Sequence, residues 1–298
     1  MQPKHQLSQH PQRTALHNEI HARPPQALTA PLAISHIVMV CDATQLEASR
    51  AHVAALARDH HLSVPDAQSS HCRIDLPQYQ LRWELHTEFV TWTIMSPLPA
   101  ERLGETEPNR ALDHVAQEWI SSLPGQCLTS LHLWVSPALA VGAPALVKKM
   151  LSEDALIASS VAGGVAEVYT DFCMRADGFS RMVLLAGALS PRRLGRLVQR
   201  LLEIETYRMT ALLGLPAARE ASSVLASAER ELAELARSIR SATAKDEPML
   251  LDRLTKLASQ VESQHAANHS RFSASAAYFE LVDKRIHEIN ETVLPGMQ

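Results

Sequence analysis

The sequence predicts an α+β protein, in which a mixed-sheet domain is followed by three long helices. Nine of the thirteen aromatic residues and seven of the ten glycines precede Pro191, and such residues are typical of strands and turns. After that point prolines occur only at 191, 216, 248 and 295, which are positions where helices can start or stop. The predicted organisation is an N-terminal arm over 1–31, an α+β domain over 32–190 and a long-helix region over 191–298.

The elements of the predicted α+β domain follow from hydrophobic periodicity. The mostly apolar stretch LAISHIVMVC predicts a buried strand over 32–41, and a 3.6-residue period of apolar residues predicts a helix over 44–60. Alternation of period two predicts strands at 71–78 and 80–96, the second folding into a hairpin near His86 and Thr87. A further helix is expected near 109–122. The remaining expected strands cover 127–136, 164–176 and 179–189. The glycine pair within 159–168, Gly163 and Gly164, is interpreted as a turn between strands.

The three C-terminal helices are expected at 192–213, 217–243 and 248–294. The third carries an apolar seam with alternating spacings of three and four, which predicts a coiled-coil-like rod of about 70 Å. The second has a matching stripe, and a short polar link joins the two, so they are expected to form an antiparallel helical hairpin. The seam is interpreted as an assembly surface made of Leu250, Leu254, Leu257, Val261, Phe272, Phe279, Val282, Ile286, Ile289 and Val293.

Two histidine pairs are the candidate ligand sites. His17, Glu19, His21 and Arg23 would point one way on an extended segment, which suits an anion, a carboxylate or a metal. The zinc-protease signature fails because Asn18 stands where glutamate is required. An arm that merely tethers itself to the domain explains the same residues.

The second pair interrupts the apolar seam of the third helix. His265 and His269 have helical spacing and could bind a transition metal. Polar residues within such a seam also set register and partner choice, or simply face water.

Composition excludes several classes of protein. The formal charge of −4 leaves no basic field for a nucleic acid backbone. The four cysteines form no CxxC pair and no spacing typical of zinc. The polar N-terminus lacks the apolar region of a secretory signal, and the sequence offers no clean apolar stretch of 18 residues.

The stretches NEIHARPP at 18–25 and LLEIETYRMTALLGLP at 201–216 resemble a bacterial family of uncharacterised proteins with a domain of unknown function. This resemblance covers nearly the whole chain. It implies a protein on the cytoplasmic side of the inner membrane, anchored by a hydrophobic segment that follows the long helix. This chain ends at 298 before such a segment, either by truncation or as a variant, so it is expected to be soluble. The family brings no known catalytic residues.

Three hypotheses of function remain open. The leading one is a non-enzymatic cytosolic module of a membrane-anchored protein, which binds a ligand or partner and forms a homo-oligomer through its long helices. The second rests on a similar layout and makes the chain the regulatory domain of a two-helix magnesium and cobalt transporter. The third is a metal-dependent enzyme that uses His17, Glu19 and His21. No cofactor is identified, and a divalent metal is the candidate that the last two hypotheses share.

Overall fold

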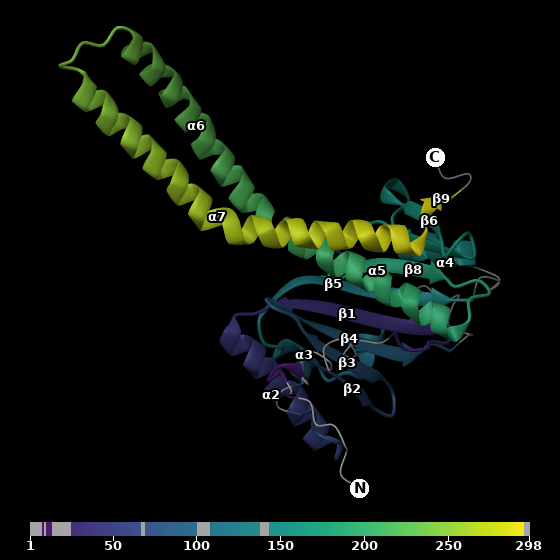
Figure 1. Ribbon diagram of the computed structural model, residues 1–298. Coiled ribbons are helices and arrows are strands. Elements are labelled where there is room, and N and C mark those ends of the chain that lie inside the picture. The colour runs from purple at the N-terminus through teal and green to yellow at the C-terminus, as the bar shows by residue number, and fades with distance from the viewer. Residues whose placement is uncertain are drawn as a thin grey trace. The chain divides into compact units, whose positions relative to one another are not determined.

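The computed structural model describes residues 8, 10–13, 25–66, 69–99, 108–137 and 143–294 (Figure 1). The chain divides into two compact units. The first combines Met1–Leu202 with Ile286–Gln298, and the second is Glu203–Arg285. We describe each unit by itself.

The first unit is built on a nine-stranded sheet with the order β2-β3-β4-β1-β5-β8-β7-β6-β9. All neighbouring strands are antiparallel except β5 and β8, which run parallel, so the sheet is mixed as predicted. The strands are β1 (Leu32–Val40), β2 (His71–Asp75), β3 (Gln80–Leu85), β4 (Phe89–Pro97), β5 (Gln126–Ser136), β6 (Ile157–Val161), β7 (Ala166–Thr170), β8 (Ser180–Leu185) and β9 (Thr292–Val293).

Helices cover both faces of this sheet, which explains why β1 is buried along nearly its whole length. One face packs Trp83, Trp92 and Trp134 against short helices. The opposite face is covered by α5, whose first half is buried at Leu194 and Leu197. The helices on the tryptophan face are α2 (Ala43–Asp59), the 3-10 helix η2 (Ala111–His114), α3 (Gln117–Ser121) and α4 (Ala143–Met150).

The structure confirms some predicted elements and corrects others. The predicted hairpin is present, since β3 and β4 pair through a turn closed by the hydrogen bond from the His86 N–H to the Phe89 carbonyl. The single helix expected near 109–122 is wrong. Val115 has an extended backbone between η2 and α3, and this breaks the helix into two short pieces.

The strand expected over 164–176 is also too long. The glycine pair does form a turn, because Gly163 and Gly164 both have positive φ angles between β6 and β7. Strand β7 then ends at Thr170, where Phe172 adopts a left-handed conformation with φ 51°. The carboxylate of Asp171 stabilises this exit by accepting hydrogen bonds from the backbone N–H groups of Ser152 and Cys173.

Three helices follow the sheet strands: α5 (Pro191–Leu212), α6 (Gly214–Arg240) and α7 (Glu247–Ile289). The last helix ends five residues before the predicted boundary at 294. Asn290 has φ 49°, which stops the helix, and the chain then pairs as β9 with β6. Val293 is therefore a strand residue, 71% exposed, and not part of a helical seam. Among the described helices, none combines the length and apolarity that crossing a membrane would require.

The second unit is a helical hairpin with a small core. The buried residues Ala228 and Leu235 of α6 pack against Leu250 and Leu257 of α7. A linker of six residues separates the two helices, so they run antiparallel. The second half of α5 packs along the later part of α7, where the rings of Tyr207 and Tyr278 stack at 5.8 Å.

Candidate functional site

The structure describes one of the two predicted ligand sites and not the other. His17, Glu19, His21 and Arg23 fall outside the described residues. His265 and His269 are exposed neighbours on α7, with ring centroids 5.3 Å apart. Across the described part of the chain, no three His, Cys, Asp or Glu side chains are close enough together to hold a metal ion.

The predicted seam of α7 divides between several environments. Leu250 and Leu257 are buried against α6, and Val261 packs at the edge of the same core. Phe272 and Phe279 are 38% and 68% exposed. The last members belong to the first unit, where Ile289 is buried and Ile286 is partly buried. Val282 is also partly buried.

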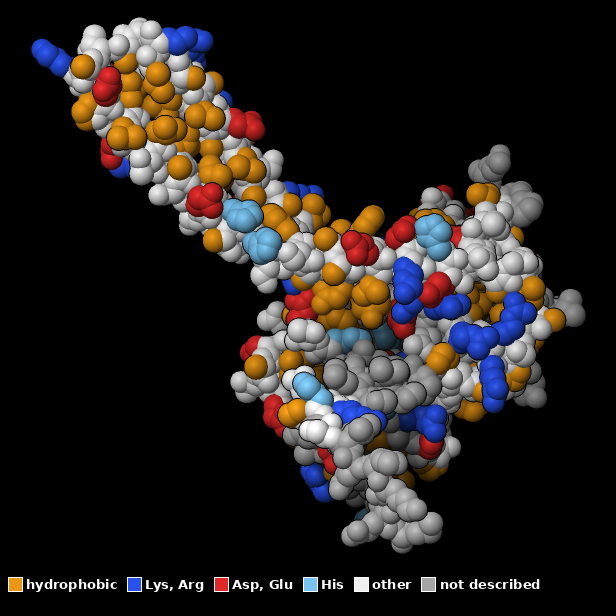
Figure 2. Space-filling view, viewed as in Figure 1, with side chains coloured by type: hydrophobic (Ala, Val, Ile, Leu, Met, Phe, Trp, Pro, Cys, Tyr) orange, Lys and Arg blue, Asp and Glu red, His pale blue; other side chains and the backbone are white. Residues whose placement is uncertain are grey.

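A row of exposed apolar side chains lies beside the core of the hairpin. Leu225, Leu232 and Ile239 of α6 recur every seven residues, each three positions before a residue of the hairpin core. Leu254 of α7 stands at the same offset before Leu257, and positions of equal offset lie on the same side of an antiparallel pair. We call Leu225, Leu232, Ile239, Leu251 and Leu254 the hairpin face. Each is between 39% and 65% exposed, and Figure 2 shows hydrophobic side chains gathered along this hairpin.

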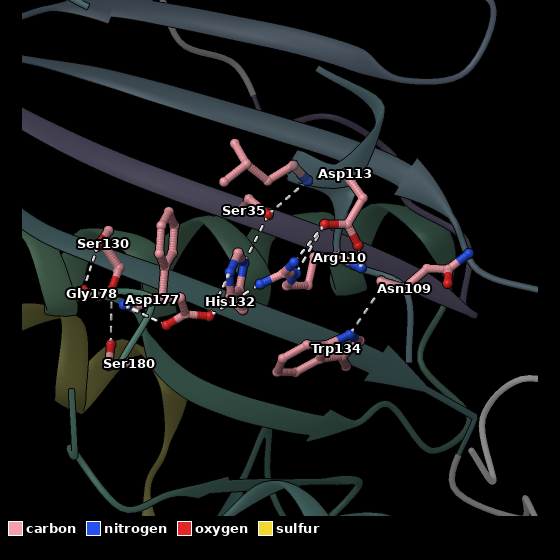
Figure 3. Close-up of polar contacts among 12 residues, drawn as sticks. Ser35, Asn109, Arg110, Asp113, Ser130, His132, Trp134, Asp177, Gly178 and Ser180 are labelled. Carbon is pink, nitrogen blue, oxygen red and sulfur yellow. Dashed lines mark hydrogen bonds and ion pairs between the residues drawn. The ribbon is translucent and has the colours of Figure 1, made fainter. Parts of the chain in front are cut away.

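A charged cleft of about 370 Å³ opens in the first unit. Its walls come from four segments that are far apart in the sequence: residues 108–113, strand β5, Met150 at the end of α4, and residues 175–181. They meet because β5 and β8 are parallel neighbours, which places His132 beside Arg181. Figure 3 shows the polar contacts around this meeting point.

Hydrogen bonds from β5 hold the two loops of the cleft in place. The indole Nε1 of Trp134 donates to the carbonyl of Asn109 at 3.2 Å, which anchors the segment before η2. The hydroxyl of Ser130 donates to the carbonyl of Gly178 at 2.9 Å, which anchors the loop before β8. Both anchors come from buried residues, so the walls of the cleft are set by the sheet itself.

Arg110 links the two loops. Its Nε donates to Asp113 at 3.0 Å, and its Nη1 donates to Asp177 at 3.2 Å. The hydrogen bond to Asp113 is the main reason why the pKa of Arg110 lies above its usual value. Burial acts to raise the pKa of Asp177, but the Phe179 N–H and the nearby cationic groups outweigh it and leave that pKa lowered. Arg110 and Asp177 are therefore both charged at neutral pH.

His132 lies under this ion-pair network in its neutral form. Burial lowers its pKa to about 4, although the carboxylate of Asp177 opposes the shift. Its ring stacks on Phe179 at 4.0 Å, and its Nδ1 lies 2.9 Å from the hydroxyl of Ser35. Because that hydroxyl oxygen already accepts the Leu112 N–H, its own proton can be donated to Nδ1. The proton of the neutral ring is then on Nε2, facing Asp177 at 3.9 Å.

Ser35, His132 and Asp177 thus form a row of the residue types found in hydrolase triads, but the geometry does not suit catalysis. Ser35 is fully buried and its oxygen is used by a backbone N–H. The distance from His132 to Asp177 exceeds a hydrogen bond. We interpret these three residues as structural, because their contacts connect β1, β5 and the loop before β8.

A family model for a protein of unknown function, DUF3422, matches residues 8–298. The chain belongs to the DUF3422 family. This match agrees with the resemblance to an uncharacterised family that the sequence motifs indicate. No curated protein and no solved structure matches the chain.

The cleft of this DUF3422 protein is not predicted by its sequence. Arg110, Arg175 and Arg181 stand in three unrelated stretches, and no spacing connects them. The only local signal is the turn predicted at Asp177 and Gly178, which proves to lie in the cleft wall. The cleft becomes visible only when the parallel pairing of β5 and β8 is known.

Proposed function

We propose that this DUF3422 chain is an assembly module, in which the hairpin face of one copy packs against that of a second copy. The observation that carries the proposal is the row of Leu225, Leu232 and Ile239, exposed at seven-residue spacing beside the hairpin core. Such a row is typical of helices that contribute to a larger bundle.

The small core of the hairpin supports a second copy as the occupant. Four buried apolar residues, with two partly buried neighbours, form the core between α6 and α7. Helices in proteins gain most of their stability from packing an apolar face against other elements. Two hairpins joined through their faces would form a four-helix bundle. Each leucine covered is already about half buried, so it would contribute roughly 1 kcal/mol, about half the value for a fully exposed side chain. A face made of one repeated position is also suited to a symmetric contact between identical chains.

The charge of the hairpin argues against a lipid surface as the occupant. Helices that lie on membranes have a polar face rich in lysine and arginine. Helix α6 instead carries four arginines and four glutamates, so it has no net positive charge. The assembly proposed here depends on apolar contact between protein surfaces.

The test is the mass of the full chain in solution, measured by sedimentation velocity and light scattering over a range of concentrations. The wild-type chain is expected to form a concentration-dependent oligomer. Leu232→Asp should reduce it to a monomer, because the new carboxylate would be buried without a partner. The matched control is Ser223→Asp, which adds the same charge at an exposed position of α6. Ser223 lies on the side of the helix roughly opposite to Leu232.

Two results would overturn the proposal. One is an oligomer of unchanged mass in Leu232→Asp, provided that circular dichroism shows the variant to be folded. The other is a monomeric wild-type chain at all concentrations. If that monomer also sediments with phosphatidylcholine vesicles and Leu232→Asp does not, the hairpin face binds lipid instead.

A further inference from the structure

The cleft of the first unit contains one arginine, Arg181, that forms no salt bridge with a described residue, although it is near enough to Asp177 to help lower the pKa of that carboxyl group. Arg110 is held by Asp113 and Asp177, and Arg175 forms an ion pair with Asp171. In the described part of the chain, Arg181 makes no ion pair within 4.0 Å and its side chain donates no hydrogen bond to protein. A guanidinium group in such a place is expected to have an acceptor.

The donors left over in the cleft come from two neighbouring guanidinium groups. The Nε atoms of Arg175 and Arg181 are both buried, and neither has a hydrogen-bond acceptor among the described residues. Both side chains line the cleft. Guanidinium groups present planar pairs of N–H donors that match the two oxygens of a carboxylate or the oxygens of a phosphate.

We propose that the cleft is a binding site for a small monocarboxylate, whose carboxylate group is held by Arg181 with the help of Arg175. A single guanidinium group that forms no salt bridge and has a buried Nε without an acceptor favours a ligand with a single negative charge. Asp113 and Asp177 line the same cleft, so a ligand with two or more negative charges would be repelled. A phosphate monoester carries about 1.5 to 2 negative charges at pH 7, so the cleft should favour a monocarboxylate over it.

The remaining walls define the rest of the ligand. Trp134, Met150 and Pro108 contribute apolar surface beside the arginines. The volume of about 370 Å³ is at the lower end of the range for small-molecule sites, which begins at about 300 Å³. The ligand expected is thus an acid with a short apolar body. Because the loops are anchored to β5, the cleft is largely formed before the ligand binds.

The experiment is calorimetric titration of the full-length protein with acetate, butyrate and benzoate at constant ionic strength. Inorganic phosphate and chloride are titrated in parallel. Saturable binding of at least one monocarboxylate is expected, together with a matching rise in melting temperature. Arg181→Gln should weaken this binding at least tenfold, and Arg181→Lys should weaken it less because it keeps the charge.

The control variant is Arg73→Gln, which removes an exposed arginine of β2 and should leave binding unchanged. Each variant is first shown to have the wild-type circular dichroism spectrum and a cooperative melt. The proposal is overturned if none of the three acids binds saturably, or if a folded Arg181→Gln binds as well as wild type. Tighter binding of phosphate than of every carboxylate would overturn the assignment of the ligand class.

Discussion

The two units of the molecule use apolar residues in opposite ways. In the sheet unit the bulkiest apolar side chains are hidden, with Trp83, Trp92 and Trp134 at most 1% exposed. In the hairpin unit Leu232 and Ile239 are about half exposed, and Leu251 is 65% exposed. The sheet has helices on both faces, whereas two helices can bury only the narrow strip between them. The sheet unit therefore buries its bulkiest apolar side chains, and the hairpin unit leaves apolar surface exposed.

The largest effect is expected from breaking the core of the sheet unit. Trp92 is fully buried and its ring lies 5.4 Å from that of Trp119 and 6.5 Å from that of Trp83. Trp92→Ala should lower the free energy of unfolding by about 3–5 kcal/mol, because it leaves a cavity in a packed core. Urea denaturation followed by circular dichroism measures this loss. A loss below about 1 kcal/mol would show that the core can collapse around the gap.

A smaller effect is expected in the core of the hairpin. Leu235 is fully buried between α6 and α7, and Leu235→Ala should cost about 2 kcal/mol, the low end for leucine, because a thin core can relax. Hydrogen exchange of the α6 amides reports this unit separately. Met249→Ala removes a side chain that is 57% exposed, and it should change the exchange very little. Equal effects of the two variants would mean that Leu235 is not a core residue in solution.

Acid should act on the sheet unit, because two of its buried histidines are uncharged. Burial lowers the pKa of His36 to about 3 and that of His132 to about 4. Between these values and about 6.5, the unfolded chain binds protons that the folded chain does not. Stability should thus fall as the pH drops below about 6.5, by about 1 kcal/mol per pH unit for each group.

The variant His132→Asn isolates one of these two contributions. The amide oxygen of asparagine can still accept the hydrogen bond from Ser35, but it does not titrate. The urea midpoint of this variant should decline less between pH 7 and pH 5 than that of wild type. A decline as steep as in wild type would show that His132 does not contribute to the acid sensitivity.

The smallest effect is expected at the surface of the hairpin. Arg253 and Glu231 form an ion pair of 3.5 Å, and their side chains are 37% and 42% exposed. Glu231→Gln should change the stability of the hairpin by less than about 1 kcal/mol, since water and salt screen exposed pairs. Melts at low and high salt would reveal this difference. A loss as large as that of Leu235→Ala would contradict the view that apolar packing holds the hairpin together.

Local periodicity was sufficient to predict much of the fold. The β3–β4 hairpin follows from alternation around His86, and the three C-terminal helices begin near the predicted residues, because prolines and caps act over a few positions. The elements that were not predicted also have physical reasons. Helix α4 was not expected, and β9 is too short for any periodicity to be seen; it forms because the chain returns to the edge of β6.

The candidate sites differ in the same way. The repeat of Leu225, Leu232 and Ile239 can be seen in the sequence, but it was interpreted as part of the stripe that packs against the third helix, and these three residues are 44–52% exposed. The sequence could not say which apolar positions the partner helix would cover. The cleft depends on contacts between segments far apart in the sequence, such as the ion pair of Arg110 with Asp177, which are 67 residues apart, so no local pattern could predict it.

The division of the chain has a consequence for how its length can vary. The second unit is an insertion, because the chain leaves the first unit after Leu202 and re-enters it at Ile286. Both connections therefore stay in place if the hairpin is shortened or lengthened at its tip. Removing seven residues from each of α6 and α7 would shorten the hairpin by about 10 Å while keeping the same side apolar. The length of the hairpin can thus change without any alteration to the sequence of the sheet unit.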